Sequence, residues 1–98
     1  MKKCIFSRPA QKDFQNIYDY IAEIDEDAAL DFTTRLQLMC DNLAKMPQMG
    51  RARDDLKKGL RSFFIESYVI FYQITGTDIQ IIRVLHSARN IERIFSKR

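Results

Sequence analysis

The sequence predicts an α+β fold in which a helical hairpin packs on a small antiparallel sheet, in the order β-α-α-β-β-β with a short C-terminal helix. Apolar residues in the first half of the chain recur every three or four positions, which is the period of an amphipathic helix. The second half instead contains runs of Ile, Val, Phe and Tyr between turn residues, which is typical of β-strands. A chain of 98 residues supports one hydrophobic core, so residues 1–98 are expected to form a single domain.

The first half is predicted to form one short strand and two helices. Residues 4–6 are apolar and predict the strand, while Ser7 is placed to cap the first helix with Pro9 in its first turn. An acidic cluster at residues 25–27 ends this helix and supplies carboxylates to the start of the second, which Pro47 ends. Because the link is short, the two helices must lie antiparallel. Their apolar stripes are Ala10, Phe14, Ile17, Ile21 and Ile24, with Tyr18 beside them, and then Ala29, Phe32, Leu36, Met39, Leu43 and Met46.

The second half is predicted to form a three-stranded antiparallel meander. Residues 47–58 show neither period and are expected to form a basic loop before Gly59. The strands are expected at residues 60–65, 68–75 and 79–86. Their apolar face needs a cover, and the stripes of the helical hairpin are the only cover that we expect. Residues 88–95 return to the helical spacing and predict the terminal helix.

The composition excludes several classes of protein. Hydrophobic residues make up 46% and charged residues 30% of the chain, with 3 Gly and 2 Pro, which excludes a disordered tail. No apolar run approaches the ~20 residues of a membrane span, and the apolar stretch after Lys3 is too short for a secretory signal. Two cysteines without a CxxC spacing and a single histidine offer no metal site, and we expect no cofactor. We therefore expect a soluble protein of a reducing cytoplasm, with Cys4 and Cys40 as free, buried thiols.

The net charge of +3 conceals a difference between the two halves of the chain. Residues 1–46 contain six Lys and Arg against eight Asp and Glu, whereas residues 47–98 contain ten against five. The basic second half is where an anionic partner would bind. Because a surplus of this size also occurs on ordinary soluble surfaces, charge alone does not identify that partner.

Four strings in the sequence resemble the signature of a known family. They are Pro47–Arg51 (PQMGR), Gly59–Ser62 (GLRS), Tyr68–Tyr72 (YVIFY) and Arg83–Asn90 (RVLHSARN), preceded by Asp19–Ala22 (DYIA) in the first helix. In this order and spacing they resemble the ParE toxins of the RelE/ParE superfamily of bacterial type II toxin–antitoxin systems. The resemblance covers nearly the whole chain and implies a RelE/ParE-like fold. It also implies a ParD-like antitoxin as partner, with operator DNA contacted only through that antitoxin and no role at a membrane.

The resemblance leaves two target classes open, because the ParE branch is associated with poisoning DNA gyrase and the RelE branch cleaves mRNA on the ribosome. RNA cleavage requires proton-transfer groups and cations. Arg61 and Arg83 could supply positive charge, and His86 has a suitable unperturbed pKa of about 6.5. A second proton-transfer group is harder to find, and the formal candidates are Glu66, Tyr68 and Tyr72. Tyr68 and Tyr72 share one strand face with Ile70, so they are expected to face the core. Each of these groups also has a structural alternative to a catalytic role. His86 could cap the last helix or bind a backbone carbonyl. The two strand arginines could pair with Asp54, Asp55 or Glu66.

Inhibition of gyrase by binding requires no catalytic group on the toxin. On this hypothesis we expect a binding inhibitor rather than an enzyme, with no catalytic residue. The expected target contacts are Arg61, Arg83, His86, Arg89 and Arg93. A third hypothesis is a non-toxic partner that only binds an antitoxin. Direct reading of DNA is not expected, because no basic helix is part of a helix-turn-helix.

The expected antitoxin contacts are apolar residues outside the core stripes. An antitoxin tail that is disordered alone could place a helix or a strand along the sheet edge and the flank of the hairpin. The candidate contacts are Tyr20, Leu30, Leu38 and Phe63. For each of them the alternative is an ordinary exposed apolar side chain.

Overall fold

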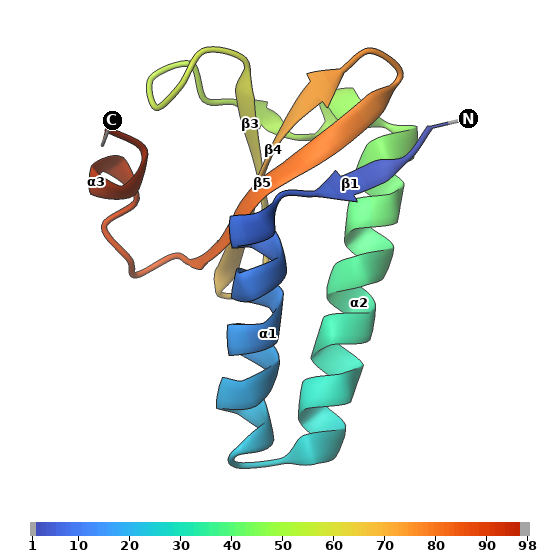
Figure 1. Ribbon diagram of the computed structural model, residues 1–98, viewed down its shortest axis with the longest axis vertical. Coiled ribbons are helices and arrows are strands. Elements are labelled where there is room, and N and C mark those ends of the chain that lie inside the picture. The colour runs from blue at the N-terminus through green and yellow to red at the C-terminus, as the bar shows by residue number, and fades with distance from the viewer. Residues whose placement is uncertain (1, 97–98) are drawn as a thin grey trace.

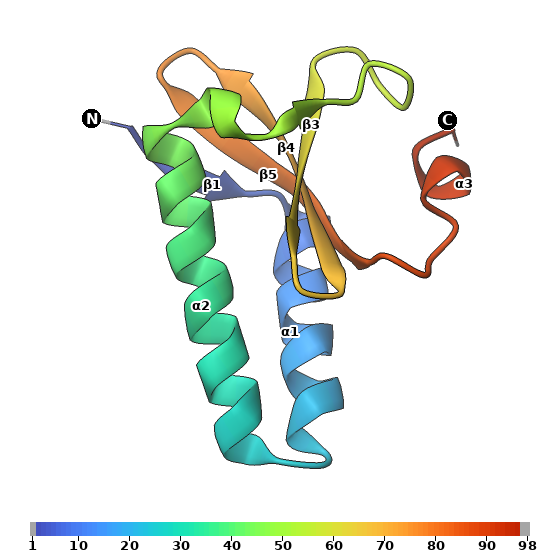
Figure 2. The ribbon, with the colours of Figure 1, turned by 180° about the vertical axis from the view of Figure 1, so that it is seen from behind.

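The computed structural model describes residues 2–96 as a five-stranded mixed sheet with the helical hairpin on one face (Figures 1 and 2). The short terminal helix lies apart from the hairpin, beyond the end of the last strand. This order confirms the predicted hairpin, meander and C-terminal helix. In chain order the elements are β1 (Cys4–Phe6), α1 (Arg8–Ala22), α2 (Glu26–Lys45), the 3-10 helix η1 (Pro47–Met49), β2 (Arg51–Ala52), β3 (Leu60–Ile65), β4 (Tyr68–Thr75), β5 (Asp78–His86) and α3 (Ile91–Ser96).

The strands follow the order β1-β5-β4-β3-β2 across the sheet. Strands β3, β4 and β5 form the predicted antiparallel meander, and the short strand β2, which was not predicted, pairs antiparallel with β3. Strand β1 differs from the prediction, because it pairs parallel with β5 and places Cys4 opposite Ile79. Parallel neighbours need a long crossover connection, which the whole of the chain between β1 and β5 provides. The first and last strands of the sequence therefore lie side by side.

Both long helices begin at the predicted caps. Ser7 Oγ accepts a hydrogen bond from the Ala10 N–H (3.1 Å) and donates one to the Ile82 carbonyl (2.8 Å), which also ties the start of α1 to β5. Asp25 caps α2 by accepting a hydrogen bond from the Ala28 N–H. The acidic cluster therefore works as expected, because its first carboxylate satisfies an otherwise free amide of the helix.

Two residues of the predicted stripes lie outside the core. Ile24 is 84% exposed and Met46 is 62% exposed. Each lies past the last turn of its helix, where the chain changes direction, so the helical spacing no longer aims its side chain at the sheet. The prediction that these two residues join the core is wrong.

The main core lies between the hairpin and the sheet. Tyr72 is fully buried there and Tyr68 packs against its edge, which confirms that both tyrosines face the core. The buried residues of this main core are Ala10, Ile17, Phe32, Leu36, Cys40, Leu43, Ala44, Ile65, Ile70, Tyr72, Ile79, Ile81 and Val84.

A second, smaller core covers the opposite face of the sheet. It buries Leu60, Val69, Phe71 and Leu85. The cover consists of α3 and the segment before β3, with Leu56, Ile91, Ile94 and Phe95 among the packed residues. The rings of Phe71 and Phe95 meet edge to face at 4.9 Å. The expectation that the hairpin is the only cover is therefore wrong, because α3 and this segment bury the second face.

The predicted loop at residues 47–58 is more ordered than expected, since it contains η1 and the two-residue strand β2. Within residues 2–96, no helix is long and apolar enough to cross a membrane. In the same part of the chain, no group of three or more His, Cys, Asp and Glu side chains is placed to hold a metal ion.

Candidate functional site

Arg61 supports the turn that follows α2. It lies in β3 opposite Tyr72, and its guanidinium donates hydrogen bonds to the carbonyls of Gly50 (2.6 Å) and Gln48 (3.3 Å). Its Nε is buried and has no hydrogen-bond partner among residues 2–96. Arg61 is half-buried and bound to backbone oxygens, so the structure gives it a clear role in holding the turn.

Tyr72 holds the same turn from the neighbouring strand. Its hydroxyl donates to the Pro47 carbonyl (2.7 Å) and accepts from the Gly50 N–H (2.9 Å). A Cβ atom on Gly50 would overlap this hydroxyl and lie 2.8 Å from two carbons of the ring. The turn therefore requires glycine at position 50, because the backbone there lies too close to the tyrosine to leave space for a side chain.

Arg83 is tied to the hairpin by a buried ion pair. Its Nε and one terminal nitrogen donate to the two carboxylate oxygens of Asp13 at 2.7 and 2.9 Å. Asp13 lies in α1, is 7% exposed and also accepts from the Val84 N–H (2.9 Å). These hydrogen bonds raise the pKa of Arg83. The partner of Arg83 is thus a carboxylate of the first helix. The alternative partners that the sequence suggested were Asp54, Asp55 and Glu66, and Arg83 pairs with none of them.

A β-bulge lies directly before Arg83 in β5. Phe71 pairs with Arg83 and Tyr72 pairs with Ile81, so Ile82 is an extra residue in β5. Such a bulge bends a strand and re-aims its side chains. The extra residue lets Ile81 and Val84 both face the main core, while Ile82 and Leu85 pack in the second core.

His86 lies exposed at the end of β5. Its Nδ1 accepts a hydrogen bond from the Ala88 N–H (3.0 Å), and its ring meets Tyr68 edge to face at 5.2 Å. The Nδ1 atom of His86 thus accepts a hydrogen bond from a backbone N–H. For a structural role of His86, the sequence had suggested a bond to a backbone carbonyl or a cap on the last helix.

His86 also lines a cleft of about 570 Å³ between the hairpin and the β3–β4 turn. Tyr20 and Tyr68 line the same cleft, and burial raises the pKa of Tyr68. Across the cleft Arg35 forms ion pairs with Asp31 and Glu66. The only cation among the cleft-lining residues is therefore already neutralised by two carboxylates.

Arg89 and Arg93 are exposed near the C-terminal helix. They border a small hollow of about 280 Å³ together with Asn90 and Ile94. No ion pair holds either arginine within residues 2–96. Both remain available for contact with an anionic partner.

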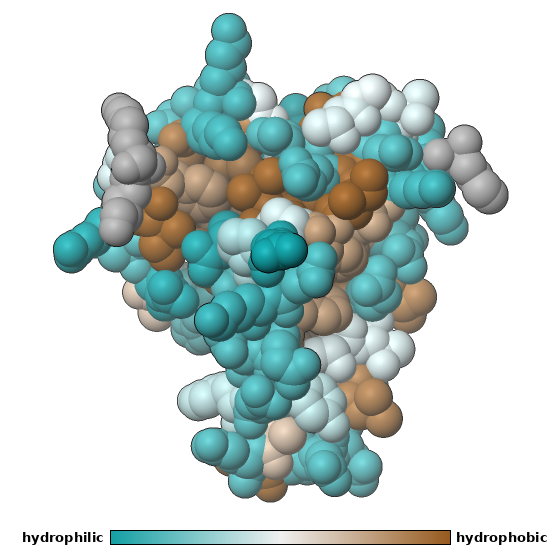
Figure 3. Space-filling view, in the orientation of Figure 1, coloured by the Kyte–Doolittle hydropathy of each residue, from teal (hydrophilic) through white to brown (hydrophobic). Residues whose placement is uncertain are grey.

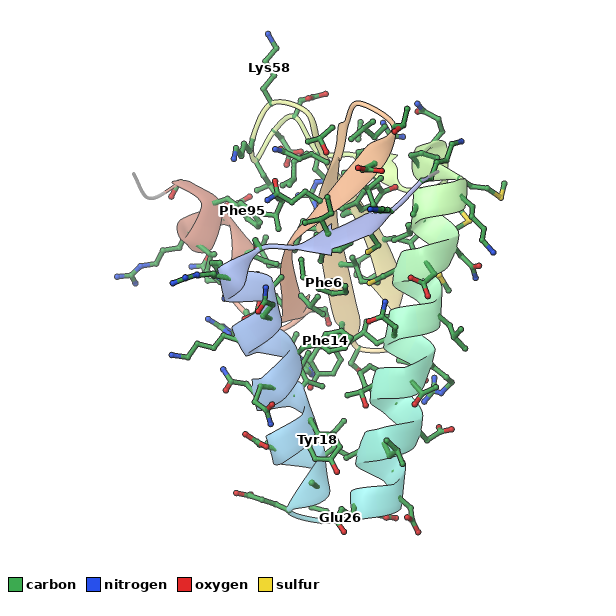
Figure 4. All side chains as sticks on the ribbon, turned by 45° about the vertical axis from the view of Figure 1, so that its right-hand side comes forward. Phe6, Phe14, Tyr18, Glu26, Lys58 and Phe95 are labelled. Carbon is green, nitrogen blue, oxygen red and sulfur yellow. The ribbon has the colours of Figure 1, made fainter. Side chains whose placement is uncertain are left out.

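Three cations of the segment before β3 share this side of the molecule. Leu56 packs in the second core with residues of α3, which places the segment and α3 over one face of the sheet (Figure 1). Lys58 projects from the tip of the segment into solvent (Figure 4). We call the exposed residues Arg51, Lys57, Lys58, Arg89 and Arg93 the cationic rim. Arg51, Lys57 and Lys58 belong to the basic loop predicted from the sequence, but they were not among the predicted target contacts.

The five predicted target contacts thus fall into two groups. Arg61 and Arg83 are bound to the turn and to Asp13 on the hairpin side of the sheet. His86 at the end of β5 and Arg89 and Arg93 beyond it are exposed. The structure does not bring the four arginines together on one face, because the second core and α3 separate them.

The four predicted antitoxin contacts are also divided. Tyr20, Leu30 and Leu38 are 66%, 60% and 57% exposed, as that prediction requires. Phe63 instead packs against the main core, and its neighbour Phe64 is 61% exposed. Phe63 was expected off the core, and this placement is wrong because β3 turns residue 63 toward the hairpin.

A groove of about 1040 Å³ runs between the two helices and beneath β1. Figure 4 shows Phe6, Phe14 and Tyr18 one above another along it. Leu38 forms part of its wall in α2, and Ile5 of the edge strand, 46% exposed, also lines it. Hydrophobic surface gathers around β1 in Figure 3, above the hydrophilic surface of α1. This surface combines an apolar groove with the unpaired edge of a sheet.

Comparison with known proteins agrees with this geometry. Residues 4–91 match the family model of the ParE toxin of type II toxin–antitoxin systems, parDE. The chain is 34% identical over 91 residues to toxin ParE1 of Caulobacter vibrioides, which covers 92% of this chain and 94% of that relative. It is 32% identical over 91 residues to toxin ParE1 of Mycobacterium tuberculosis, with coverage of 91% and 93%.

A solved structure shares the fold. It is a chain of the chromosomal ParDE TA system from P. aeruginosa, with a TM-score of 0.74 and 25% identity over 88% of this chain and 96% of that chain. The family match, the two relatives and the shared fold cover the same part of the chain. This chain therefore belongs to the ParE toxin family and is the toxin component of a type II toxin–antitoxin system.

Proposed function

We propose that this toxin inhibits DNA gyrase by binding it through the cationic rim, and that a ParD-like antitoxin neutralises the toxin by binding the groove beneath β1. The observation that carries the first half is the set of five exposed cations around α3 and the segment before β3. Exposed cations that lie close together attract an acidic protein surface or DNA phosphate. Gyrase bound to DNA offers both.

Binding is favoured over RNA cleavage by the state of the candidate catalytic groups. Arg83 is engaged by Asp13, and Arg61 by two carbonyl groups. The Nδ1 atom of His86 already accepts a backbone hydrogen bond, which leaves Nε2 as the free nitrogen. A nuclease would need these cations free to stabilise the charge that develops on the phosphate. We therefore assign the target contact to Arg89, Arg93 and the rest of the rim.

Reversal of two rim charges is expected to abolish most of the inhibition. The double variant Arg89→Glu/Arg93→Glu should require at least roughly ten times more toxin for half-inhibition of gyrase supercoiling, because it replaces attraction by repulsion. Both side chains are exposed, so folding should be unaffected. The matched control is Arg8→Glu/Lys12→Glu, which reverses two exposed cations of α1 that do not belong to the rim.

The same assay separates gyrase binding from the alternative. His86→Ala should retain inhibition of supercoiling, since the histidine is not required to transfer a proton. Two results together would refute the proposal. Wild-type toxin would leave gyrase supercoiling intact and would cleave mRNA on translating ribosomes, and His86→Ala would abolish that cleavage. Equal loss of inhibition in the α1 control would show that net charge, rather than the rim, is responsible.

The groove supports the second half of the proposal, because it has the two features that a disordered antitoxin tail needs. An apolar groove between helices accepts the apolar face of a helix, and a free strand edge accepts an added strand. Leu30 and Leu38 lie two turns apart on one side of α2, so one helix could contact both. The likeness to a chain of the ParDE system of P. aeruginosa is consistent with such a partner.

A charge placed in the groove is expected to weaken antitoxin binding. Leu38→Asp should raise the dissociation constant of the antitoxin encoded by the adjacent reading frame by at least roughly ten-fold, because it buries an unpaired carboxylate in the complex. Isothermal titration calorimetry measures this change. The control is Met46→Asp, which changes an apolar residue of similar exposure that does not line the groove. A larger loss in the control than in Leu38→Asp would place the antitoxin elsewhere.

A further inference from the structure

The outer edge of β3 is paired over only part of its length. Strand β2 pairs with Arg61 and Ser62, and the Arg53 N–H extends this ladder by donating to the Leu60 carbonyl (2.7 Å). In an antiparallel ladder the N–H and C=O of one residue point to the same side, and this side alternates along the strand. Because the Leu60 carbonyl points toward β2, the polar groups of Phe64 point to the same edge, where β2 no longer reaches. Within residues 2–96, Phe64 has no backbone hydrogen bond outside the sheet.

The side chain of Phe64 lies on the second-core face of the sheet at this free edge. Phe64 pairs with Val69, which is buried in the second core, and paired residues place their side chains on the same face. Phe64 itself is 61% exposed, so α3 and the segment before β3 leave most of it uncovered. An aromatic ring therefore lies in solvent beside backbone groups that can accept another strand.

One cation of the cationic rim lies on the same face and at the same edge. Arg51 is exposed and pairs with Ser62, and Ser62 in turn pairs with Phe71 of the second core. Phe64 follows Ser62 by two residues, which makes Arg51 and Phe64 diagonal neighbours on one face. Such neighbours lie about 7–8 Å apart, within reach of long side chains. The rim thus extends from α3 to the edge of β3 and includes an aromatic ring there.

We propose that an extended acidic segment of gyrase adds to the free edge of β3 as a strand, packs an apolar side chain on Phe64 and places a carboxylate on Arg51. The assignment rests on gyrase being the target, as proposed above, and it makes the partner at this edge a protein segment. A strand edge supplies main-chain hydrogen bonds, and the neighbouring side chains select the sequence. Duplex phosphate would satisfy Arg51 but offers no matching N–H and C=O ladder and no apolar surface for Phe64. The groove assigned to the antitoxin lies beneath β1, at the opposite edge of the sheet.

Hydrogen–deuterium exchange of the full chain, alone and bound to gyrase on duplex DNA, tests the added strand. Mass spectrometry with single-residue fragmentation should show that the Phe64 N–H exchanges at least roughly ten times more slowly in the complex, because it becomes hydrogen-bonded. The Ser62 N–H is the internal control, since β2 already pairs with Ser62. Unchanged exchange at Phe64 in a toxin that inhibits supercoiling would overturn the inference and leave the proposed function intact. Slower exchange with the antitoxin, or at high toxin concentration, but not with gyrase would assign the edge to another occupant and would also overturn it.

Two variants of Phe64 separate the ring from the backbone. Phe64→Ala should raise the toxin concentration for half-inhibition of supercoiling at least roughly ten-fold, because it removes an aromatic contact at the interface. Phe64→Pro also removes the N–H, which an edge strand tolerates on its outward side, and it should inhibit less well than Phe64→Ala. The control Ile24→Ala changes an apolar residue that is 84% exposed and should inhibit like the wild type. Circular dichroism checks that each variant folds.

The remaining outcomes are equally decisive. Inhibition by Phe64→Ala that equals that of the wild type would overturn the contact. Binding of the toxin to duplex DNA without gyrase, weakened by Phe64→Ala as much as inhibition is, would assign the edge to DNA instead. A wild-type toxin that does not inhibit gyrase would refute the proposed function itself, and the inference with it.

Discussion

Replacement of Asp13 by alanine is expected to lower the free energy of unfolding by about 3–5 kcal/mol. Asp13 is 7% exposed and accepts hydrogen bonds from Arg83 and from the Val84 N–H at 2.7–2.9 Å. Removal of the carboxylate leaves a partly buried guanidinium without its counter-charge and a buried backbone N–H without its acceptor, and both are costly. Urea unfolding followed by circular dichroism measures the change.

Two further variants identify the cause of this loss. Asp19→Ala removes an exposed carboxylate of the same helix that accepts from Gln15, and it should change stability by less than about 0.5 kcal/mol. Asp13→Ala/Arg83→Met should recover part of the loss, because the uncompensated charge is gone as well. A cost below about 1 kcal/mol for Asp13→Ala would show that water replaces the carboxylate.

Gly50→Ala is expected to be the next most damaging change, at about 2–4 kcal/mol. The added methyl group would overlap the hydroxyl of Tyr72, which is fully buried and cannot move away without losing its hydrogen bonds to Pro47 and Gly50. Either the turn shifts or the ring does, and each movement breaks contacts at the junction of α2 with the sheet. The same unfolding experiment measures the loss.

Tyr72→Phe and Gly76→Ala separate steric overlap from loss of hydrogen bonds and from backbone strain. Tyr72→Phe keeps the ring but removes both hydrogen bonds, for an expected cost of about 1–3 kcal/mol. Gly76 has φ +66° with no atom within 4 Å of an added Cβ, so Gly76→Ala should cost only about 1 kcal/mol of backbone strain. A Gly50→Ala cost no larger than that of Gly76→Ala would contradict the proposed overlap.

These two clusters hold the two ends of the hairpin. Asp13 ties α1 to β5, whereas Tyr72 ties the end of α2 to β4. The groove beneath β1 lies between these helices, so its shape depends on both attachments. The residues expected to affect stability most are therefore also those that position the proposed antitoxin site.

Most of the fold could be predicted from neighbouring residues alone. Ser7 and Asp25 cap the helices as expected, and the bounds of β3 and β4 agree with the sequence pattern. Caps, turns and periodicity are local properties, because each depends on residues a few positions apart. The parallel pairing of β1 was not predicted, since its partner β5 lies at the other end of the chain.

The candidate site was predicted less completely, because it depends on where side chains point after folding. The sequence placed Arg61, Arg83, Arg89 and Arg93 in one basic half but could not show which of them remain free. Phe63 and Phe64 illustrate the same limit, because adjacent residues of a strand face opposite sides and only the register decides which side is the core.

The amino-acid sequence by itself determined the family resemblance, the order of helices and strands, and the excess of positive charge in the second half. Only the tertiary structure decided how that charge is divided. The packing of α1 against β5 brings Asp13 to Arg83, while Arg89 just before α3 and Arg93 within it are exposed to solvent. Formation of an ion pair depends on the distance between side chains in space, and that distance is set by the packing of elements that are remote in sequence.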